Sequence, residues 1–232
     1  ESAVKPAEAK PFMEDFIDMV KLAIKPLVLV FILSAFTYVL IEQSIMSWLP
    51  TYNSKVLSLP TTLSIQMASI LAASTALGRF LAGIVLRKIH WFNVLALCLL
   101  AASVLVLVAI PLAKQGTGNE VTGWNNAPLA AFVFPIIGLF LAPIYPAINS
   151  VILSALPPRQ HGPMSGLIVI FSALGGTTGS IITGHIFEAY DGQTAFYFSL
   201  IPITILLTAL FFFNRLQKKS EAPIAFTSTG GH

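Results

Sequence analysis

Residues 34–53, SAFTYVLIEQSIMSWLPTYN, place a single acidic side chain, Glu42, inside a long apolar run. A carboxylate at the centre of a bilayer costs about 2.5–3.5 kcal/mol even on lenient insertion scales. Acids in such positions therefore face a protein interior or a water-filled cavity, where they mark a path for ions or substrate. This stretch predicts a membrane-spanning helix with one polar face.

The composition of the chain extends this prediction to the whole molecule. Of the 232 residues, 56% are hydrophobic and 10% are charged, and the mean hydropathy is +0.82. A soluble domain carries about 25% charged residues, so the composition indicates a polytopic membrane protein. The net charge of +3 does not indicate a nucleic-acid partner, because the basic residues lie between apolar runs. The single cysteine, Cys98, excludes an internal disulfide and a cysteine-ligated zinc site, and the sequence indicates no metal or cofactor.

The apolar residues form six segments, each with the roughly 20 residues that a helix needs to cross a bilayer. A shorter segment, residues 11–25, is amphipathic and predicts a helix lying on the membrane surface. We therefore expect an all-α membrane protein with a six-transmembrane-helix bundle. The predicted parts are a linker with the interfacial helix over 1–25, spans over 26–50, 61–86, 91–113, 129–156, 163–190 and 195–216, and a tail over 217–232.

Lysine and arginine concentrate on one predicted side of the membrane. The positive-inside rule assigns that side to the cytoplasm, so both ends of this sequence are expected there, in the inner (plasma) membrane. The cytoplasmic set is Lys5, Lys10, Lys21, Lys25, Arg79, Arg87, Lys88, Arg159, Arg215, Lys218 and Lys219, against Lys55 and Lys114 on the other side.

The first span carries the first group of candidate site residues. Tyr38, Glu42 and Met46 recur every four residues and share one helix face, with Gln43 beside them. If this face lines a cavity, Glu42 can bind substrate or couple an ion; the alternative is a structural carboxylate bonded to a neighbouring helix. Trp48 is equally compatible with a platform that stacks on a sugar and with an anchor at the membrane interface.

The fourth span carries the second group. Pro135, Pro143 and Pro146 each remove a backbone donor and are expected to bend the helix beside a cavity or neighbouring helices. Tyr145 and Asn149 lie one turn apart on one face, which makes them candidates for substrate binding. A hydrogen bond between helices is the equally good alternative for both.

The fifth span has small residues at four-residue spacing, which predicts close packing against another helix. The residues are Ser172, Gly176, Ser180 and Gly184, with Gly175 and Gly179 on the adjoining stripe.

An intramembrane enzyme is not expected. Ser165 and His185 lie at opposite ends of one predicted helix, about 30 Å apart, so they cannot act as nucleophile and base. No second acid inside an apolar run is present to form a dyad with Glu42.

Three motifs resemble those of the major facilitator superfamily. The first, at the end of the second span, resembles the repeated cytoplasmic signature between helices eight and nine. Two others resemble the fucose, galactose and glucose:proton symporter branch, in its helices seven and ten. The motif residues are Gly78, Arg79, Gly83, Arg87 and Lys88, then Tyr38, Glu42, Trp48, Leu49, Pro50, Thr51 and Tyr52, then Gly138, Ala142, Pro143, Ile144, Tyr145 and Pro146.

The resemblance implies the carboxyl-terminal half of a twelve-helix transporter, helices seven to twelve. Its obligate partner would be an amino-terminal six-helix bundle related by pseudo-two-fold symmetry, with substrate held between the two halves and alternating access by rocking. The implied activity is proton-coupled symport of a small polar solute, most readily a sugar. In that branch the principal proton carboxylates lie largely in the amino-terminal half, so Glu42 either carries the proton or binds substrate.

Two other functions remain open on the same fold. One is a proton-driven exporter of hydrophobic compounds, and the other is a membrane receptor or scaffold that no longer transports.

Overall fold

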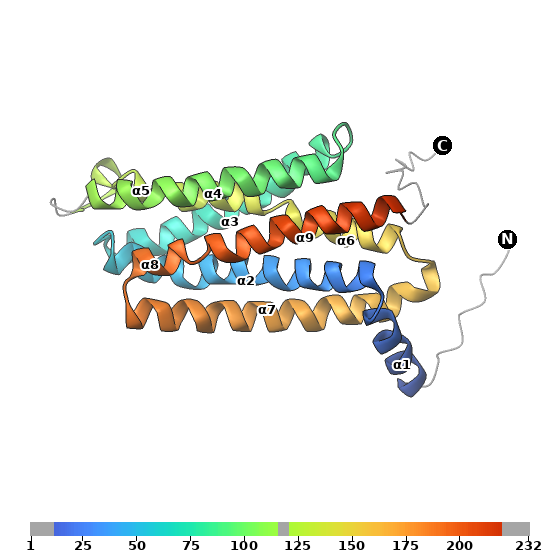
Figure 1. Ribbon diagram of the computed structural model, residues 1–232. Helices are drawn as coiled ribbons and strands as arrows, with labels where there is room; N and C mark the ends of the chain where they lie inside the picture. Colours follow the sequence, from blue (N-terminus) through green and yellow to red (C-terminus); the bar gives the residue numbers. More distant parts are fainter. Residues whose placement is uncertain (1–11, 116–120, 220–232) are drawn as a thin grey trace, which may run out of the picture.

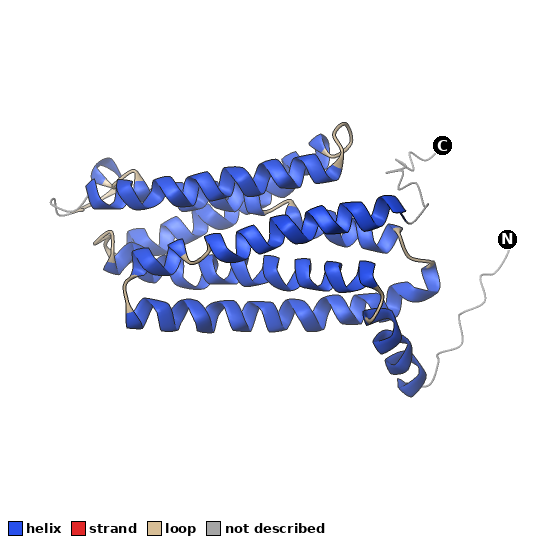
Figure 2. Cartoon of the chain, viewed as in Figure 1, coloured by secondary structure: helices blue, strands red, loops and turns tan. Residues whose placement is uncertain are grey.

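The computed structural model describes residues 12–115 and 121–219, and this part of the chain is almost entirely α-helical, without a strand (Figure 2). Six helical segments are long and apolar enough to cross a membrane. The predicted fold class, an all-α bundle of six membrane-length helices, is confirmed. The predicted segments 1–10 and 220–232 lie outside the described residues.

Eleven helical elements make up the described chain, because three-residue turns and one short surface helix accompany the spans. In order they are α1 (Phe12–Ala23), α2 (Pro26–Lys55), α3 (Thr61–Val85), α4 (Trp91–Gln115), η1 (Trp124–Asn126), α5 (Ala130–Leu141), α6 (Ile144–Ser154), η2 (Pro158–Gln160), α7 (His161–Ala189), α8 (Gly192–Tyr197) and α9 (Leu200–Lys219).

The first span is longer than predicted. The predicted span ends at residue 50, but α2 continues through Pro50 to Lys55. Proline removes only the donor that would meet the carbonyl four residues earlier, and the next turn is held by packing. Tyr52 is fully buried there, with its ring edge-on to Phe134 at 5.0 Å and to Phe196 at 4.7 Å between centroids. This aromatic cluster fixes the carboxyl-terminal end of α2 against α5 and α8.

The fourth span is divided where one of its three prolines lies. Pro135 stays inside α5 and Pro146 stays inside α6, whereas Ala142 and Pro143 separate the two helices. The chain thus leaves regular helix only at Ala142 and Pro143, and the predicted bends at Pro135 and Pro146 stay predictions. Pro143 has no N–H for the Leu139 carbonyl, and Gly78 of α3 lies directly against that oxygen, where a Cβ would collide with it. A glycine on the neighbouring helix thus covers the carbonyl that the proline frees.

Two other boundaries differ from the sequence prediction. The fifth span begins at His161 instead of residue 163, because proline is tolerated in the first turn of a helix. The last span begins at Gly192 as α8, where Asp191 caps the helix by accepting the Thr194 N–H, and it is interrupted before α9. α9 reaches Lys219, so the predicted tail starts inside a helix.

Helix α2 lies at the centre of the bundle and packs most extensively against α7 and α9, whereas α5 joins α3 to α4 (Figure 1). The contact between α2 and α7 is made by backbone. A Cβ on Gly175 would collide with the Phe36 carbonyl, and one on Gly179 would collide with the Leu40 carbonyl. This confirms the predicted close packing of the fifth span, although the adjoining glycine stripe makes the contact.

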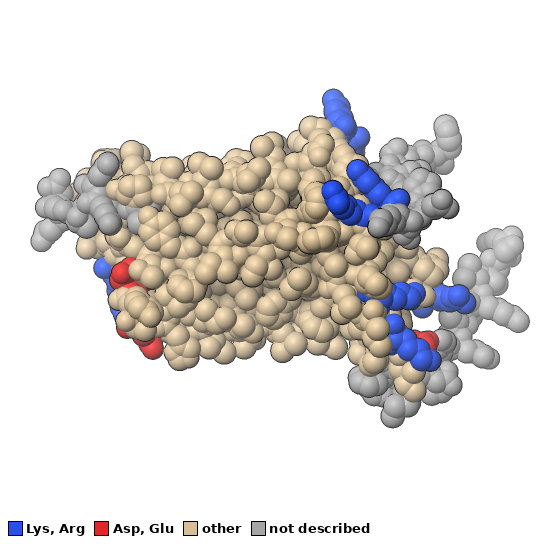
Figure 3. Space-filling view, viewed as in Figure 1, with Lys and Arg blue, Asp and Glu red and all other residues tan. Residues whose placement is uncertain are grey.

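Charged side chains gather at the two ends of the bundle and leave its flank apolar (Figure 3). One end carries α1 and the end of α9, and the basic residues of the described chain concentrate there (Figure 1). An apolar flank is required where a helix bundle contacts lipid. Inside it, the ion pair between Glu42 and Arg79 is the notable exception.

Candidate functional site

Glu42 lies near the middle of α2, where its side chain is 18% exposed. Its Oε1 atom accepts a hydrogen bond from the Tyr38 hydroxyl at 2.9 Å, one helical turn away. The same oxygen lies 3.5 Å from Nη2 of Arg79 on α3. The carboxylate that the sequence places alone in an apolar run therefore has a cationic partner on the neighbouring helix, which lowers the cost of keeping it charged there.

Arg79 reaches Glu42 because Gly78 brings α3 close to the bundle. Gly78 is buried against Leu139 and Ala142, and the next residue points its guanidinium toward α2. The Arg79 side chain is nevertheless 51% exposed. The sequence motif predicts that Arg79 belongs to a cytoplasmic signature, and in the structure its guanidinium also pairs with Glu42. The ion pair is thus accessible from one side, unlike a fully enclosed pair.

Two tyrosines connect Glu42 to helices α6 and α7. The Tyr38 ring stacks on the Tyr145 ring of α6, with centroids 5.6 Å apart and planes 21° from parallel. The Tyr145 hydroxyl lies 3.0 Å from the Ser172 hydroxyl of α7. Through these contacts Arg79, Glu42, Tyr38, Tyr145 and Ser172 form a continuous polar and aromatic chain across α3, α2, α6 and α7, which we call the cross-bundle network.

Tyr38 itself does not face an open cavity. The sequence predicted that it lines the cavity beside Glu42, but its side chain is fully buried. Residues at positions i and i+4 share a helix face, yet the Tyr145 ring covers Tyr38 and leaves Glu42 partly exposed. The buried Tyr38 therefore orients the Glu42 carboxylate through its hydrogen bond.

Asn149 and Gln43 are both half-buried and lie close to this network in the sequence. Asn149 follows Tyr145 by one turn of α6, and its buried amide oxygen has no hydrogen-bond partner among the described residues. Unpaired buried acceptors are costly and need an explanation, such as a ligand or water that donates to them. The aliphatic part of Gln43 packs over Gly176 of α7, which places its side chain at the α2–α7 seam.

Trp48 contacts α7, and its two sequence interpretations, a sugar platform and an interfacial anchor, stay predictions. Its indole N–H donates to the Ser180 carbonyl of α7 at 2.9 Å, and its ring stacks on Phe187 with centroids 5.5 Å apart. Gly184 provides the space for the ring, because a Cβ there would press on it. One face of the indole is thus occupied by Phe187, and the residue joins α2 to α7.

The remaining signature residues are exposed near the basic end of the bundle. Gly83 faces open space, because a Cβ there would meet nothing within 4 Å among the described residues apart from the backbone of its own helix and its two neighbours in the chain. Arg87 and Lys88 lie in the turn between α3 and α4 and are exposed. These three residues therefore have no structural task within this bundle that the described contacts reveal.

The site also contains residues whose role the sequence analysis missed. It did not pair Arg79 with Glu42, although one base and one acid, each inside an apolar run, were the available signal. It counted Ser172 only as a small packing residue, and nothing in its spacing distinguishes a hydroxyl that meets Tyr145.

Comparison with protein-family models finds a match to the Major Facilitator Superfamily over residues 116–229, which includes α5 to α9. A comparison with curated proteins finds no match. The superfamily consists of transporters and not of enzymes. The resemblance to the superfamily is thus confirmed, whereas the sugar-symporter branch stays a prediction. The match thus identifies a Major Facilitator Superfamily domain over residues 116–229, and the six membrane-length helices of the described chain are consistent with it.

Proposed function

We propose that this chain is the carboxyl-terminal half of a secondary transporter that imports a small polar solute, with a sugar as the first candidate, together with protons. In this proposal it works with an amino-terminal six-helix half, and the substrate binds between the two halves. The transporter would lie in the inner (plasma) membrane, with Lys21, Arg87, Arg159 and the other basic residues at one end of the bundle on the cytoplasmic side.

The observation that carries this proposal is the cross-bundle network. Glu42 and Arg79 form an accessible ion pair between two helices inside the span, where charged groups are expensive and usually functional. A proton on Glu42 would neutralise the carboxylate and remove its attraction for Arg79. Loading of a proton would then loosen α2 from α3, which is a direct link between proton binding and helix position.

Polar groups beside the pair support a hydroxylated substrate. The unpartnered Asn149 oxygen can accept a hydrogen bond, and the amide of Gln43 can both donate and accept. A sugar presents several hydroxyls that match such groups. Exporters of hydrophobic compounds need fewer of them, so these side chains favour the polar solute.

The decisive experiment measures uptake by the complete transporter in proteoliposomes, over a panel of sugars, with and without an inward proton gradient. Glu42→Gln is expected to abolish gradient-driven uptake while leaving insertion into the membrane intact. Glu188→Gln is the matched control, because Glu188 is an exposed acid near the far end of α7. Unchanged uptake and unchanged pH dependence in Glu42→Gln would contradict the proposal.

Substrate exchange without a gradient separates the two roles open to Glu42. If Glu42 carries the proton, exchange of labelled for unlabelled substrate persists in Glu42→Gln. If Glu42 binds substrate, exchange is lost together with uptake. Binding without any flux in the unmodified protein would instead indicate a receptor, and flux only of hydrophobic compounds outward would indicate an exporter.

A further inference from the structure

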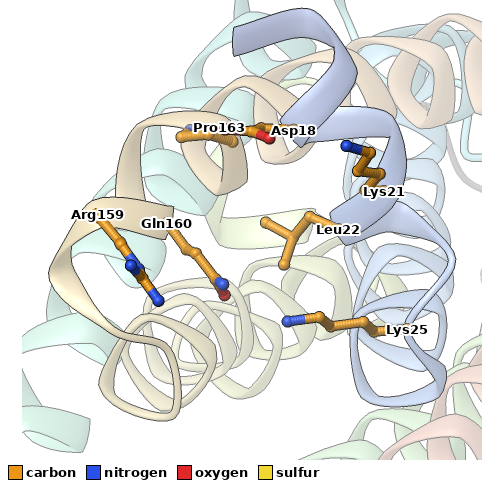
Figure 4. Close-up of a pocket in the computed structure, with 7 residues that line it drawn as sticks. All are labelled: Asp18, Lys21, Leu22, Lys25, Arg159, Gln160 and Pro163. Atoms are coloured by element: carbon orange, nitrogen blue, oxygen red, sulfur yellow. The ribbon is translucent and has the colours of Figure 1, made fainter. Parts of the chain in front are cut away.

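A basic pocket lies where α1 meets the start of α7, at the end of the bundle that carries most of the positive charge (Figures 3 and 4). Its volume is about 350 Å³. Three cationic side chains and one carboxylate are among the residues that line it. The lining consists of Asp18, Lys21, Leu22, Lys25, Arg159, Gln160 and Pro163.

The positive side chains of the pocket come from two different parts of the chain. Lys21 belongs to the last turn of α1 and Lys25 to the link before α2, whereas Arg159 belongs to the turn η2 before α7. Figure 4 shows the Lys25 ammonium and the Gln160 amide pointing toward one another across the opening, with Arg159 on the far side of Gln160. The sequence therefore brings three cations together by tertiary folding, and not as a run of charge.

The surrounding backbone adds to the positive potential. Helix α2 begins one residue after Lys25, and α7 begins one residue after Gln160. Neither helix has a side-chain cap or an acidic residue in its first turn. The N-terminus of a helix carries a partial positive charge, so the two helix starts reinforce the three side chains. Cations at helix N-termini oppose the helix dipole, and a bound anion would relieve that repulsion.

Gln160 contributes a further polar group to the pocket. It is half-buried, and its Oε1 atom is buried without a hydrogen-bond partner among the described residues. An acceptor in that state is stabilised by a donor such as a hydroxyl group. The pocket thus combines charges that suit a phosphate with an oxygen that suits a hydroxyl next to it.

The apolar face of α1 indicates where such a ligand comes from. Ile17 and Val20 of α1 are exposed, as is Ile24 directly after it at 68%, although α1 packs on α7 through Met19, which would lie 3.3 Å from a Cβ on Gly166. A helix with an exposed apolar stripe beside basic residues is typical of a segment in the headgroup region of a bilayer. Basic pockets next to membrane helices on the cytoplasmic side suit anionic lipid headgroups.

From these observations we infer that the pocket binds the headgroup of an anionic phospholipid of the phosphatidylglycerol type. Lys25 and Arg159 contact the phosphodiester, Lys21 adds positive charge at the edge of the pocket near Asp18, and Gln160 accepts a hydrogen bond from a headgroup hydroxyl. The acyl chains extend beside the exposed apolar residues of α1. The inference concerns a site apart from the cross-bundle network and does not depend on the proposed transport activity.

Native mass spectrometry and thermal melting of the full chain in detergent test this inference with four added probes. They are phosphatidylglycerol, phosphatidylcholine, glycerophosphoglycerol, which lacks acyl chains, and inorganic phosphate. Phosphatidylglycerol is expected to bind and to raise the melting temperature, and the other three are expected to have little effect. An equal effect of inorganic phosphate or glycerophosphoglycerol would show a site for free anions and overturn the lipid assignment, as would an equal effect of phosphatidylcholine.

Variants then locate the site. Each cation near an anionic headgroup is worth about five-fold in affinity, so removing Lys21, Lys25 and Arg159 together by substitution with Gln is expected to weaken binding roughly a hundred-fold. Arg87→Gln, Lys88→Gln and Lys218→Gln together form the matched control, with the same charge removed from the same end of the bundle. Equal losses in the two triple variants would overturn the assignment to this pocket.

Gln160→Leu tests the hydroxyl contact by itself. It is expected to weaken binding of phosphatidylglycerol several-fold and to leave binding of phosphatidylmethanol, which has no headgroup hydroxyl, unchanged. Equal weakening of both lipids would remove Gln160 from the headgroup contact.

Discussion

The two sides of α2 are held in different ways. Toward α7 the contact is made by backbone against backbone at Gly175 and Gly179, and Ser44 donates a hydrogen bond to the Gly179 carbonyl at 3.1 Å. Toward α3 the packing is much sparser, and the main polar contact is the 3.5 Å ion pair of Glu42 with the half-exposed Arg79.

This difference separates a fixed contact from a breakable one. Close helix packing is lost only when backbones move apart, whereas an exposed ion pair can be replaced by water or neutralised by a proton at little cost. Helices α2 and α7 therefore form one unit, and α3 is the neighbour whose contact with α2 can change.

The strongest test of the fixed side is Gly179→Ala. The new Cβ would collide with the Leu40 carbonyl, and a backbone atom cannot rotate away, so we expect a loss of about 3 kcal/mol in the free energy of unfolding. Unfolding by titration with SDS measures it. Gly83→Ala is the control, because a Cβ there meets open space and the change from glycine favours the helix. Equal stability of the two variants would mean that the α2–α7 contact is not tight.

Trp48→Phe removes one hydrogen bond from the same side and keeps the aromatic stacking on Phe187. The Ser180 carbonyl then loses a donor, which should cost about 1 kcal/mol in the same measurement. Trp124→Phe serves as the control, since Trp124 is exposed in the turn η1. If the two substitutions have the same effect, the bond to Ser180 does not hold α2 on α7.

A double-mutant cycle of Glu42→Gln and Arg79→Gln tests the breakable side. Because the Arg79 side chain is half exposed, we expect a coupling energy below about 1 kcal/mol, even though Glu42→Gln stops uptake. A coupling of several kcal/mol would show that the α3 side is as firmly fixed as the α7 side and would remove the contrast between them.

The smallest expected effect is a pH dependence in the turn between α3 and α4. The Nδ1 atom of His90 accepts the Phe92 N–H at 3.3 Å, and its pKa is lowered by partial burial and by the positive charge of Lys218. The folded state therefore takes up this proton less readily than the unfolded state, so stability should fall as the pH drops below about 6.5. Melting temperatures between pH 5 and 8 should depend less on pH in His90→Asn than in His185→Asn. The same slope in both would exclude His90 as the cause.

The number of spans and their approximate positions could be predicted from the sequence, because hydropathy reports what faces lipid. The roles of the prolines could not. Pro50 and Pro135 remain inside helices, whereas Pro143 lies between α5 and α6. At Pro143 the freed Leu139 carbonyl is covered by Gly78 of another helix, and such a tertiary contact cannot be read from the sequence.

The candidate site shows a similar division. The sequence identified Glu42 as the costly residue and placed Tyr38 on its face, because both follow from helical spacing and burial cost. The sequence did not reveal that Arg79 pairs with the Glu42 carboxylate or that the Tyr145 ring covers Tyr38, since both partners lie on other helices. The spacing of residues within one helix does not show which face the neighbouring helix turns toward it.

The interruption at Pro143 has a mechanical consequence. Helix α5, before it, packs on α3 and α4, whereas α6, after it, lies against α2 and α7. A change of the angle between α5 and α6 would therefore move α3 and α4 together with α5, relative to α6, α2 and α7. The Glu42–Arg79 ion pair crosses this boundary, because it joins α2 on one side of it to α3 on the other.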